Sequence, residues 1–290
     1  MVVELGSVGI WSGGLRRCNP AARLDAVAEL DSLGYGALWM PGGDAAGYFE
    51  IAAGILAATR RIVVAPGILS VWTNPAESVA AAHAELSGRY PGRMMLGLGV
   101  SHPHHVEPLG LRFEHPVAVM TEYLDALSAS TAPPARNELI LAALGPRMLE
   151  LSRDRAAGAH PYFVTPEHTR LARFVLGSGR LLVPEQAVVL ETDPARARAI
   201  SRRHMSTYLR APHYTNNLLR LGFDAADFAD PGSDRLVDAI VAWGDLEAIS
   251  RRVDGHFAAG ADHVCLQALP ADPAALPLGE WRELAGLLSR

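Results

Sequence analysis

Residues 74–99 read NPAESVAAAHAELSGRYPGRMMLGLG and contain one helix followed by one strand. After Pro75, large side chains recur every three or four residues, which predicts an amphipathic helix that begins at this proline. The side chains expected on its inner face are Val79, His83, Leu86 and Tyr90. Met94–Val100 is short and uniformly apolar, as a parallel strand that is buried on both faces should be. The stretch therefore predicts one unit of an α/β fold with a parallel sheet.

The same alternation of short apolar strands and amphipathic helices runs through the whole chain. The predicted strands are Val8–Ile10, Ala37–Met40, Ile62–Ser70, Met94–Val100, Leu139–Ala143, Ala159–Val164, Gln186–Glu191 and His263–Ala268. Eight such units in 290 residues match the (β/α)8 TIM barrel, so we expect one α/β domain over residues 1–290. Pro66 lies inside the third strand and cannot donate a ladder hydrogen bond, so we expect the pairing to be interrupted there.

The composition excludes several classes of protein. All 26 basic residues are arginine, whereas Schiff-base enzymes and the phosphate-binding P-loop both need a lysine. The net charge is −5 and no block of like charges occurs, which argues against a nucleic-acid partner. Cys18 and Cys265 form no CxxC pair, and the sequence shows neither a signal peptide nor an apolar run of about 18 residues. We therefore expect a cytoplasmic protein with no membrane partner.

In an eightfold barrel the reacting groups lie at the carboxyl ends of the strands. The fifth strand is followed by Gly145, Pro146, Arg147 and Met148, where a helix begins. The N-terminus of a helix binds phosphate through its free N–H groups, and an arginine adds a forked, permanently charged donor. These residues indicate a phosphate site, although an ordinary helix start with proline in its first turn has the same pattern.

Three histidines, His102, His104 and His105, follow the fourth strand. Imidazoles serve as metal ligands or as acids and bases near neutral pH. No carboxylate-rich strand end completes a metal shell, so we favour His102 as an acid or base and expect no metal site. A solvated loop is the alternative.

Aromatic and branched side chains end two further strands. Trp11 ends the first strand, and Ser70, Val71 and Trp72 end the third. Such groups can support a planar ring by stacking and van der Waals contact, or can simply close the core. Gly42, after the second strand, either allows a ligand to approach closely or turns the chain.

Several stretches resemble the luciferase-like superfamily, and in particular its branch of coenzyme F420-dependent oxidoreductases. The longest is 74–99, whose end at Arg93–Gly99 is the most specific. The others are GYGALW at 34–39, ATRRIVV at 58–64, ALGP at 143–146 and the segment from WGD at 243–245 to Val264. The resemblance thus covers nearly the whole chain.

The resemblance implies a barrel that binds a deazaflavin ring at its strand ends and transfers a hydride between coenzyme F420 and a small organic substrate. It implies a cis peptide bond at Ser70–Val71 behind the ring. It also places His102, as proton donor or acceptor, where sugar-phosphate dehydrogenases of this branch carry a catalytic glutamate. The expected cofactor contacts are Gly42, Ser70, Val71, Trp72, Ser101, Gly145, Pro146, Arg147 and Met148, with Trp11 and Tyr214 in the substrate pocket. Helical surface is expected to support a homodimer, as is common in this superfamily.

The chain also departs from that branch. Its sugar-phosphate dehydrogenases carry Asp-His after the second strand, where this chain has Gly42-Gly43, and they hold the sugar phosphate with lysines, which this chain lacks. These departures argue against a sugar-phosphate substrate. An FMN-dependent monooxygenase on the same fold is the main alternative. A metal-dependent hydrolase barrel built on His102 and His104, and a non-catalytic barrel, are the alternatives of another class.

Overall fold

The computed structural model describes residues 3–288, and its strands form two parallel sheets. The first has the order β10 (Ala242–Trp243), β9 (Glu185–Val189), β11 (Val264–Ala268), β1 (Val8–Trp11), β2 (Ala37–Met40) and β3 (Val63–Pro66). The second has the order β4 (Leu69–Ser70), β5 (Leu96–Gly99), β6 (Leu139–Leu141), β7 (Gly158–Ala159) and β8 (Leu181–Leu182). Every pairing in both sheets is parallel.

The two sheets join into one ring, because β3 and β4 are parts of one interrupted strand, as are β8 and β9. At the junction of β3 and β4, the N–H of Val64 in β3 donates to the carbonyl of Arg93 (2.9 Å), just before β5. At the junction of β8 and β9, the N–H of Val183 donates to the carbonyl of Ala159 in β7, and the N–H of Cys265 in β11 donates to the carbonyl of Pro184 (both 2.9 Å). The ring therefore has eight strands, with β10 added outside it, and the predicted TIM barrel is confirmed.

The interruption expected at Pro66 is present. Pro66 is the last residue of β3, where it still lies opposite Met40 of β2, and pairing resumes with β5 only at Leu69. Pro184 separates β8 from β9 in the same way. A proline has no N–H to give to the ladder, so each one marks the point at which the strand changes sheets.

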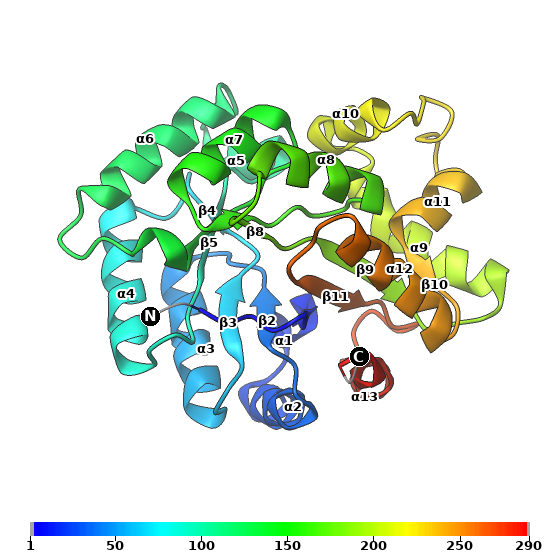
Figure 1. The fold of residues 1–290 in the computed structure, drawn as a ribbon, viewed down its shortest axis with the longest axis horizontal. Coiled ribbons are helices and arrows are strands. Elements are labelled where there is room, and N and C mark those ends of the chain that lie inside the picture. The colour runs from blue at the N-terminus through cyan, green and yellow to red at the C-terminus, as the bar shows by residue number, and fades with distance from the viewer. Residues whose placement is uncertain (1–2, 289–290) are drawn as a thin grey trace.

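Helices follow the strands and surround the barrel (Figure 1). They are α1 (Gly13–Arg17), α2 (Pro20–Leu33), α3 (Ala45–Ala58), α4 (Ala76–Arg89), α5 (Pro103–Val106), α6 (Pro116–Ser128), α7 (Pro146–Arg155), α8 (Pro166–Leu176), α9 (Pro194–Tyr208), α10 (Pro212–Arg220), α11 (Asp234–Ile240), α12 (Leu246–Ala258) and α13 (Leu278–Leu284). Many of them begin at a proline or behind a capping side chain, such as Asn19 before α2 and Thr165 before α8. In the quoted stretch, α4 buries Val79, His83 and Leu86, as its spacing predicts.

The apolar core has three parts. The largest lies between strands and helices and includes Leu30, Ile55 and Leu86. A second fills the barrel with alternate strand residues, including Trp11, Trp39 and Cys265. The third joins α9, α10 and α11 to β9 and β10, and its large members include Phe163, Met205, Tyr214, Leu218 and Leu236.

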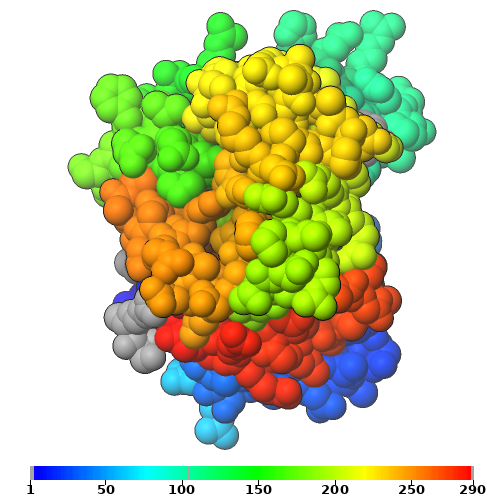
Figure 2. Space-filling model, turned by 90° about the vertical axis from the view of Figure 1, so that its right-hand side faces the viewer, coloured from blue at the N-terminus to red at the C-terminus, as the bar shows by residue number. Residues whose placement is uncertain are grey.

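The long helical segment after β9 positions the candidate site. In Figure 1, α10 lies at the top beside α5, α7 and α8, whereas α2 and α13 lie at the bottom. Figure 2 shows the yellow residues around α10 over the top of that face, above the yellow-green α9 and the orange α12. The loops at the carboxyl ends of the strands and α10 thus share one end of the molecule. Within residues 3–288, no helix is both long enough and apolar enough to span a bilayer.

Candidate active site

Aromatic side chains from four elements meet at the carboxyl end of the barrel. Trp11 ends β1, Tyr162 and Phe163 follow β7, Tyr208 ends α9 and Tyr214 lies in α10. The ring centroids of Trp11 and Tyr162 are 5.5 Å apart, and Tyr214 lies 5.3 Å from both Phe163 and Tyr208. Trp11 and Tyr214, the two residues predicted for the substrate pocket, are therefore brought to the same cluster. We call this cluster of five residues the mouth cluster.

A hydrogen-bonded chain of neutral groups crosses the mouth cluster. The Tyr162 hydroxyl donates to Oε1 of Gln267 on β11 (2.8 Å) and lies 2.8 Å from the Tyr208 hydroxyl. Since Tyr162 uses its proton on Gln267, Tyr208 must donate to Tyr162. Burial raises the pKa of Tyr208 to about 12 and that of Tyr162 well above its ordinary value, so both phenols stay protonated at neutral pH.

His102 lies beside the mouth cluster. Its ring stacks on that of His213 (centroids 4.6 Å apart, planes 9° apart) and lies 5.5 Å from Tyr214. Ser101, which precedes it, has a positive φ of 57°, and its hydroxyl is 3.5 Å from Nδ1 of His105. The left-handed backbone at Ser101 turns the chain from β5 into α5 and brings His102 over the barrel.

The described residues give the metal-site hypothesis no support. The side chain of His104 lies outside the described residues. Among the described side chains, no group of three or more His, Cys, Asp or Glu residues could hold a metal ion.

The predicted cis bond at Ser70–Val71 is wrong: that bond is trans, and the non-proline cis bond is Gly67–Ile68. The reason is the earlier end of β3 at Pro66, which moves the bend of the chain to Gly67. A Cβ built on Gly67 would lie 2.5 Å from Nε1 of Trp11, so only glycine fits there. Half-buried Ile68 then lies against β5, where it leaves no room for a side chain on Gly99.

The third-strand residues that were assigned to the cofactor have mainly structural contacts. Val71 is buried in the core between strands and helices, and its N–H donates to the carbonyl of Gly99. Nε1 of Trp72 donates to the carbonyl of Val100 (2.7 Å), and the carbonyl of Ser70 accepts from Asn74. Cofactor contact by these residues stays a prediction.

Gly42 is buried against the chain between β3 and β4. A Cβ built on it would lie 2.6 Å from the carbonyl oxygen of Ile68 and 2.7 Å from Cα of Leu69. Close approach of two backbone segments thus accounts for glycine at this position. The alternative role, contact with a cofactor, has no separate support in the structure.

The N-terminus of α7 is the strongest anion site among the predicted ones. Gly145 is its N-cap and has no capping side chain, Pro146 is the first helical residue, Arg147 is exposed and Met148 is buried below. Pro146 has no N–H and Met148 donates its N–H to the carbonyl of Gly145 (3.1 Å), so the N–H of Arg147 is the first-turn donor left at the positive end of the helix dipole.

Two residues of α10 complete this end of α7, and the sequence alone did not indicate them. A guanidinium nitrogen of Arg220 lies 3.8 Å from a Cβ built on Gly145 and donates to Oδ1 of Asn217 (3.4 Å). Asn217 is only 2% exposed, and its Nδ2 has no hydrogen-bond partner among the described residues. Arg220 thus lies beside Gly145, the buried amide of Asn217 lies beside Arg220, and Arg147 is in the first turn of α7, a set of donors that suits an anion. No local pattern relates α10 to α7, so only the folded chain shows the pair.

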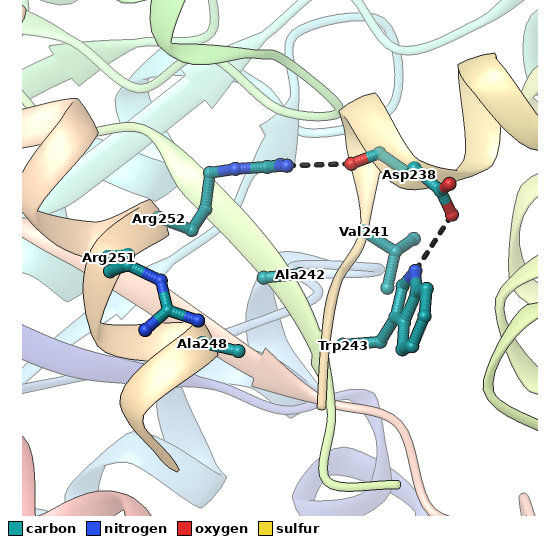
Figure 3. Close-up of a pocket in the computed structure, with 7 residues that line it drawn as sticks. All are labelled: Asp238, Val241, Ala242, Trp243, Ala248, Arg251 and Arg252. Atoms are coloured by element: carbon teal, nitrogen blue, oxygen red, sulfur yellow. Dashed lines mark hydrogen bonds between the residues drawn. The ribbon is translucent and has the colours of Figure 1, made fainter. Parts of the chain in front are cut away.

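Two cavities lie away from the mouth. One, of about 560 Å³, includes Val3, Arg136, Arg180 and Asp262 at the opposite end of the barrel. The other, of about 370 Å³, lies between α11, β10 and α12 (Figure 3). Its polar groups are already engaged: Arg252 donates to the carbonyls of Asp238 and Ala239 (both 2.6 Å), and the Asp238 carboxylate accepts from Trp243. Neither cavity has a reactive group comparable to those at the mouth.

Comparison with known proteins agrees with this architecture. Residues 10–263 match the family model described as luciferase-like monooxygenase. No curated protein matches the sequence. An F420-dependent secondary alcohol dehydrogenase, solved with an F420-acetone adduct, is 14% identical with a TM-score of 0.75; the match covers 98% of this chain and 99% of that one.

Two further solved structures show the range of the fold. The coenzyme F420-dependent tetrahydromethanopterin reductase from Methanopyrus kandleri is 17% identical with a TM-score of 0.71, and 98% of each chain is covered. A type II Baeyer-Villiger monooxygenase in complex with FMN, the oxygenating constituent of 3,6-diketocamphane monooxygenase from the CAM plasmid of Pseudomonas putida, is 14% identical. Its TM-score is 0.69, with 99% of this chain and 98% of that chain covered. These identities support a common fold.

Proposed function

Since the chain belongs to the luciferase-like monooxygenase family, we propose that it is a coenzyme F420-dependent oxidoreductase acting on a small organic substrate. The observation that carries the proposal is the position of α10, whose Tyr214 lies in the mouth cluster and whose Arg220 lies at the N-terminus of α7. One helix thus joins a site for a planar ring to a site for an anionic tail. Two of the structural neighbours described above depend on coenzyme F420, which favours it over FMN.

The anionic tail would bind at α7. Arg147, Arg220 and Nδ2 of Asn217 would supply side-chain donors there, beside the backbone N–H of Arg147. Arginine presents a rigid fork of donors that matches phosphate oxygens, so the absence of lysine does not weaken this site. The orphaned amide donor of Asn217 is the strongest sign of fit, since buried donors normally have an acceptor.

The ring would bind at the mouth cluster, beside the β3–β4 connection. Ile68 and Trp11 offer apolar contact area there, and the indole Nε1 of Trp11 is buried with no hydrogen-bond partner among the described residues. Tyr214 is only 5% exposed and packs against its neighbours, so a ring that enters must displace side chains of α10. Binding is therefore coupled to movement in this helix or its side chains.

A bound deazaflavin supplies or accepts a hydride, that is, two electrons at once. The chain's own residues orient the substrate and handle the proton. His102 would give or take this proton, because its ring lies beside Tyr214 at the mouth and an imidazole exchanges protons near neutral pH. The mouth cluster carries no charged side chain, so a neutral organic substrate fits it best.

Binding assays with both cofactors test the proposal. The purified protein should bind coenzyme F420 with a Kd in the micromolar range or below, as measured by calorimetry, and more tightly than FMN. Tight FMN binding with NADH-driven oxygen consumption would instead make it an FMN-dependent monooxygenase. Stoichiometric zinc would favour a hydrolase, and binding of neither cofactor would leave a non-catalytic barrel.

A further inference from the structure

Glu185, the first residue of β9, is a carboxyl group inside the barrel. It lies opposite Cys265 of β11 in the register, and side chains opposite each other in a parallel sheet point to the same face. Cys265 belongs to the buried cluster inside the barrel, together with Trp11, and Tyr162 packs against that cluster. Glu185 is 1% exposed. Its carboxyl group therefore lies below the mouth cluster and not on the surface.

Only one of the two oxygens of Glu185 has a hydrogen bond. Oε2 accepts the N–H of Phe163 (3.1 Å), whereas Oε1 is buried and has no partner among the described residues. No arginine or histidine forms an ion pair with Glu185 in that part of the chain. A buried carboxylate without a cation is costly, so the neutral acid is the stable form. Its proton belongs on Oε1, because Oε2 already accepts a hydrogen bond.

Four titratable groups interact electrostatically with Glu185, one from each of four elements, and all four are neutral acids. They are Tyr162 after β7, Tyr208 in α9, Tyr214 in α10 and Cys265 in β11. Burial raises the pKa of each of them, and burial raises the pKa of Glu185 to about 8. Glu185 is thus the group in this set that can lose a proton most readily.

The hydrogen-bonded chain of the mouth lies directly above this carboxyl. Gln267 follows Cys265 by two residues on β11, so its side chain is on the same face and one layer nearer the mouth. Gln267 accepts from Tyr162, which in turn accepts from Tyr208. Tyr162 also precedes Phe163, whose N–H binds Glu185, so Tyr162 lies between the layer of Glu185 and the open end of the barrel.

We propose that Glu185 stores a proton inside the barrel and exchanges it with the Tyr162 hydroxyl at the mouth across one bridging water. The role rests on the proposed function. A substrate carbonyl that gains a hydride at carbon takes one proton at oxygen. His102 gives that proton and regains one from a water in the mouth. This water takes a proton from the Tyr162 hydroxyl, Tyr162 takes one from Glu185, and the Glu185 carboxylate then takes a proton from solvent water. Because it acts through Tyr162, Glu185 is a positioning residue for the proton and not a catalytic residue.

A purely structural role is the competing explanation. Phe163 has a positive φ of 60°, and the bond from its N–H to Glu185 could serve only to hold this turn. A glutamine at position 185 can accept the same bond but cannot release a proton. Comparison of Glu185→Gln with Glu185→Ala therefore separates the role of Glu185 as a hydrogen-bond acceptor from its role as an acid.

Infrared spectroscopy of the protein without cofactor tests the inference. Wild type should show a protonated carboxyl band at neutral pH that is absent in Glu185→Gln. The control Glu191→Gln should keep this band, because Glu191 pairs with Arg196 outside the barrel. On transfer to D₂O the band should shift within the mixing time in wild type, and at least tenfold more slowly in Tyr162→Phe, which lacks the connecting hydroxyl.

The outcomes separate the proton-exchange proposal from a purely structural role of Glu185. Absence of a band sensitive to Glu185→Gln would mean that Glu185 is ionised and would overturn the proposal. Equal exchange rates in wild type and Tyr162→Phe would overturn the path and leave the structural role. Bound coenzyme F420 should slow the exchange in wild type, since it covers the mouth. Failure of coenzyme F420 to bind overturns the proposed function alone, because the exchange measurements use the protein without cofactor.

Discussion

Replacement of Glu185 by glutamine should change how the stability of this protein depends on pH. The pKa of Glu185 is about 8 in the folded protein, against an ordinary value of 4.5 for the unfolded chain. Between these two values the folded protein keeps the proton and the unfolded chain has released it. The folded state then binds more protons, so the free energy of unfolding falls as the pH rises.

The size of this effect follows from the two pKa values. One proton contributes a slope of at most about 1.4 kcal/mol per pH unit, and the window from 4.5 to about 8 gives a total of about 5 kcal/mol. Glutamine has no proton to release, so the Glu185→Gln variant lacks this slope. The substitution also lowers the free energy of unfolding by roughly 1–3 kcal/mol at every pH, because the amide donors of the glutamine are buried without acceptors. The slope and not the constant difference is the diagnostic quantity.

Urea unfolding of both proteins across this pH range measures the slope. The m-values should agree, so that differences in midpoint report differences in stability. Subtracting the two curves removes the contribution of every other titrating group, provided that none of them contacts Glu185. Wild type should lose stability relative to Glu185→Gln as the pH rises, and the difference should level off above about pH 8. A difference that stays constant with pH would show that Glu185 is not neutral in the folded protein and would refute the reasoning.

Arg220→Ala and Arg147→Ala should each weaken binding of coenzyme F420 by roughly 1–3 kcal/mol, the range for a hydrogen bond to a charged group. If calorimetry shows unchanged affinity for either variant, the guanidinium that it removes does not reach the anionic tail of the cofactor. His102→Ala should lower kcat by about 100-fold or more and leave cofactor affinity nearly unchanged, and the reverse pattern would make His102 a binding residue. Acid should also destabilise the protein between pH 6.5 and about 4, because buried histidines stay neutral in the folded state while the unfolded chain takes up protons. Each such histidine contributes at most about 1.4 kcal/mol per pH unit, and a flat urea midpoint over this range would contradict the assignment. The histidines whose pKa burial lowers to about 3 or 4 are His83, His160, His204, His256 and His263.

Local patterns in the sequence were sufficient for most of the fold. Apolar runs predicted the barrel strands, and the proline and glycine positions predicted many of the helix starts and ends, since these depend on residues close in the chain. The proline at position 66 even predicted where a strand is interrupted. The prediction for the third strand was wrong in one respect: its end was set at Ser70, which placed the cis bond three residues too late. The seventh strand was taken to begin at Gln186, so Glu185 and the short β8 before it were missed.

The site was only partly predictable, because half of it depends on contacts across the fold. His102, Trp11 and Gly145 could be proposed from the sequence, since each lies at or just after the end of a strand and the barrel places strand ends together. Arg220 and Asn217 were not found, because their helix carries no local sign of the element that it covers. The composition nevertheless limits which side chains can bind phosphate. In a chain without lysine, any strong phosphate site must combine backbone N–H groups with arginines, and the arginines near a strand end are few. A search for arginines in the helical segment after the seventh strand would have included Arg220.

The same helix, α10, explains why the ring site and the tail site should respond together. Tyr214 near its start packs into the mouth cluster, while Asn217 and Arg220 near its end lie at α7. A helix of nine residues moves as a rigid unit, so displacing Tyr214 to admit a ring also shifts the donors that bind the tail. An anion on α7 would in turn hold α10 in the position that it binds best. Each part of the cofactor then favours binding of the other by fixing one shared element. This coupling requires that Arg220→Ala weaken binding of the whole cofactor by more than it weakens binding of inorganic phosphate alone.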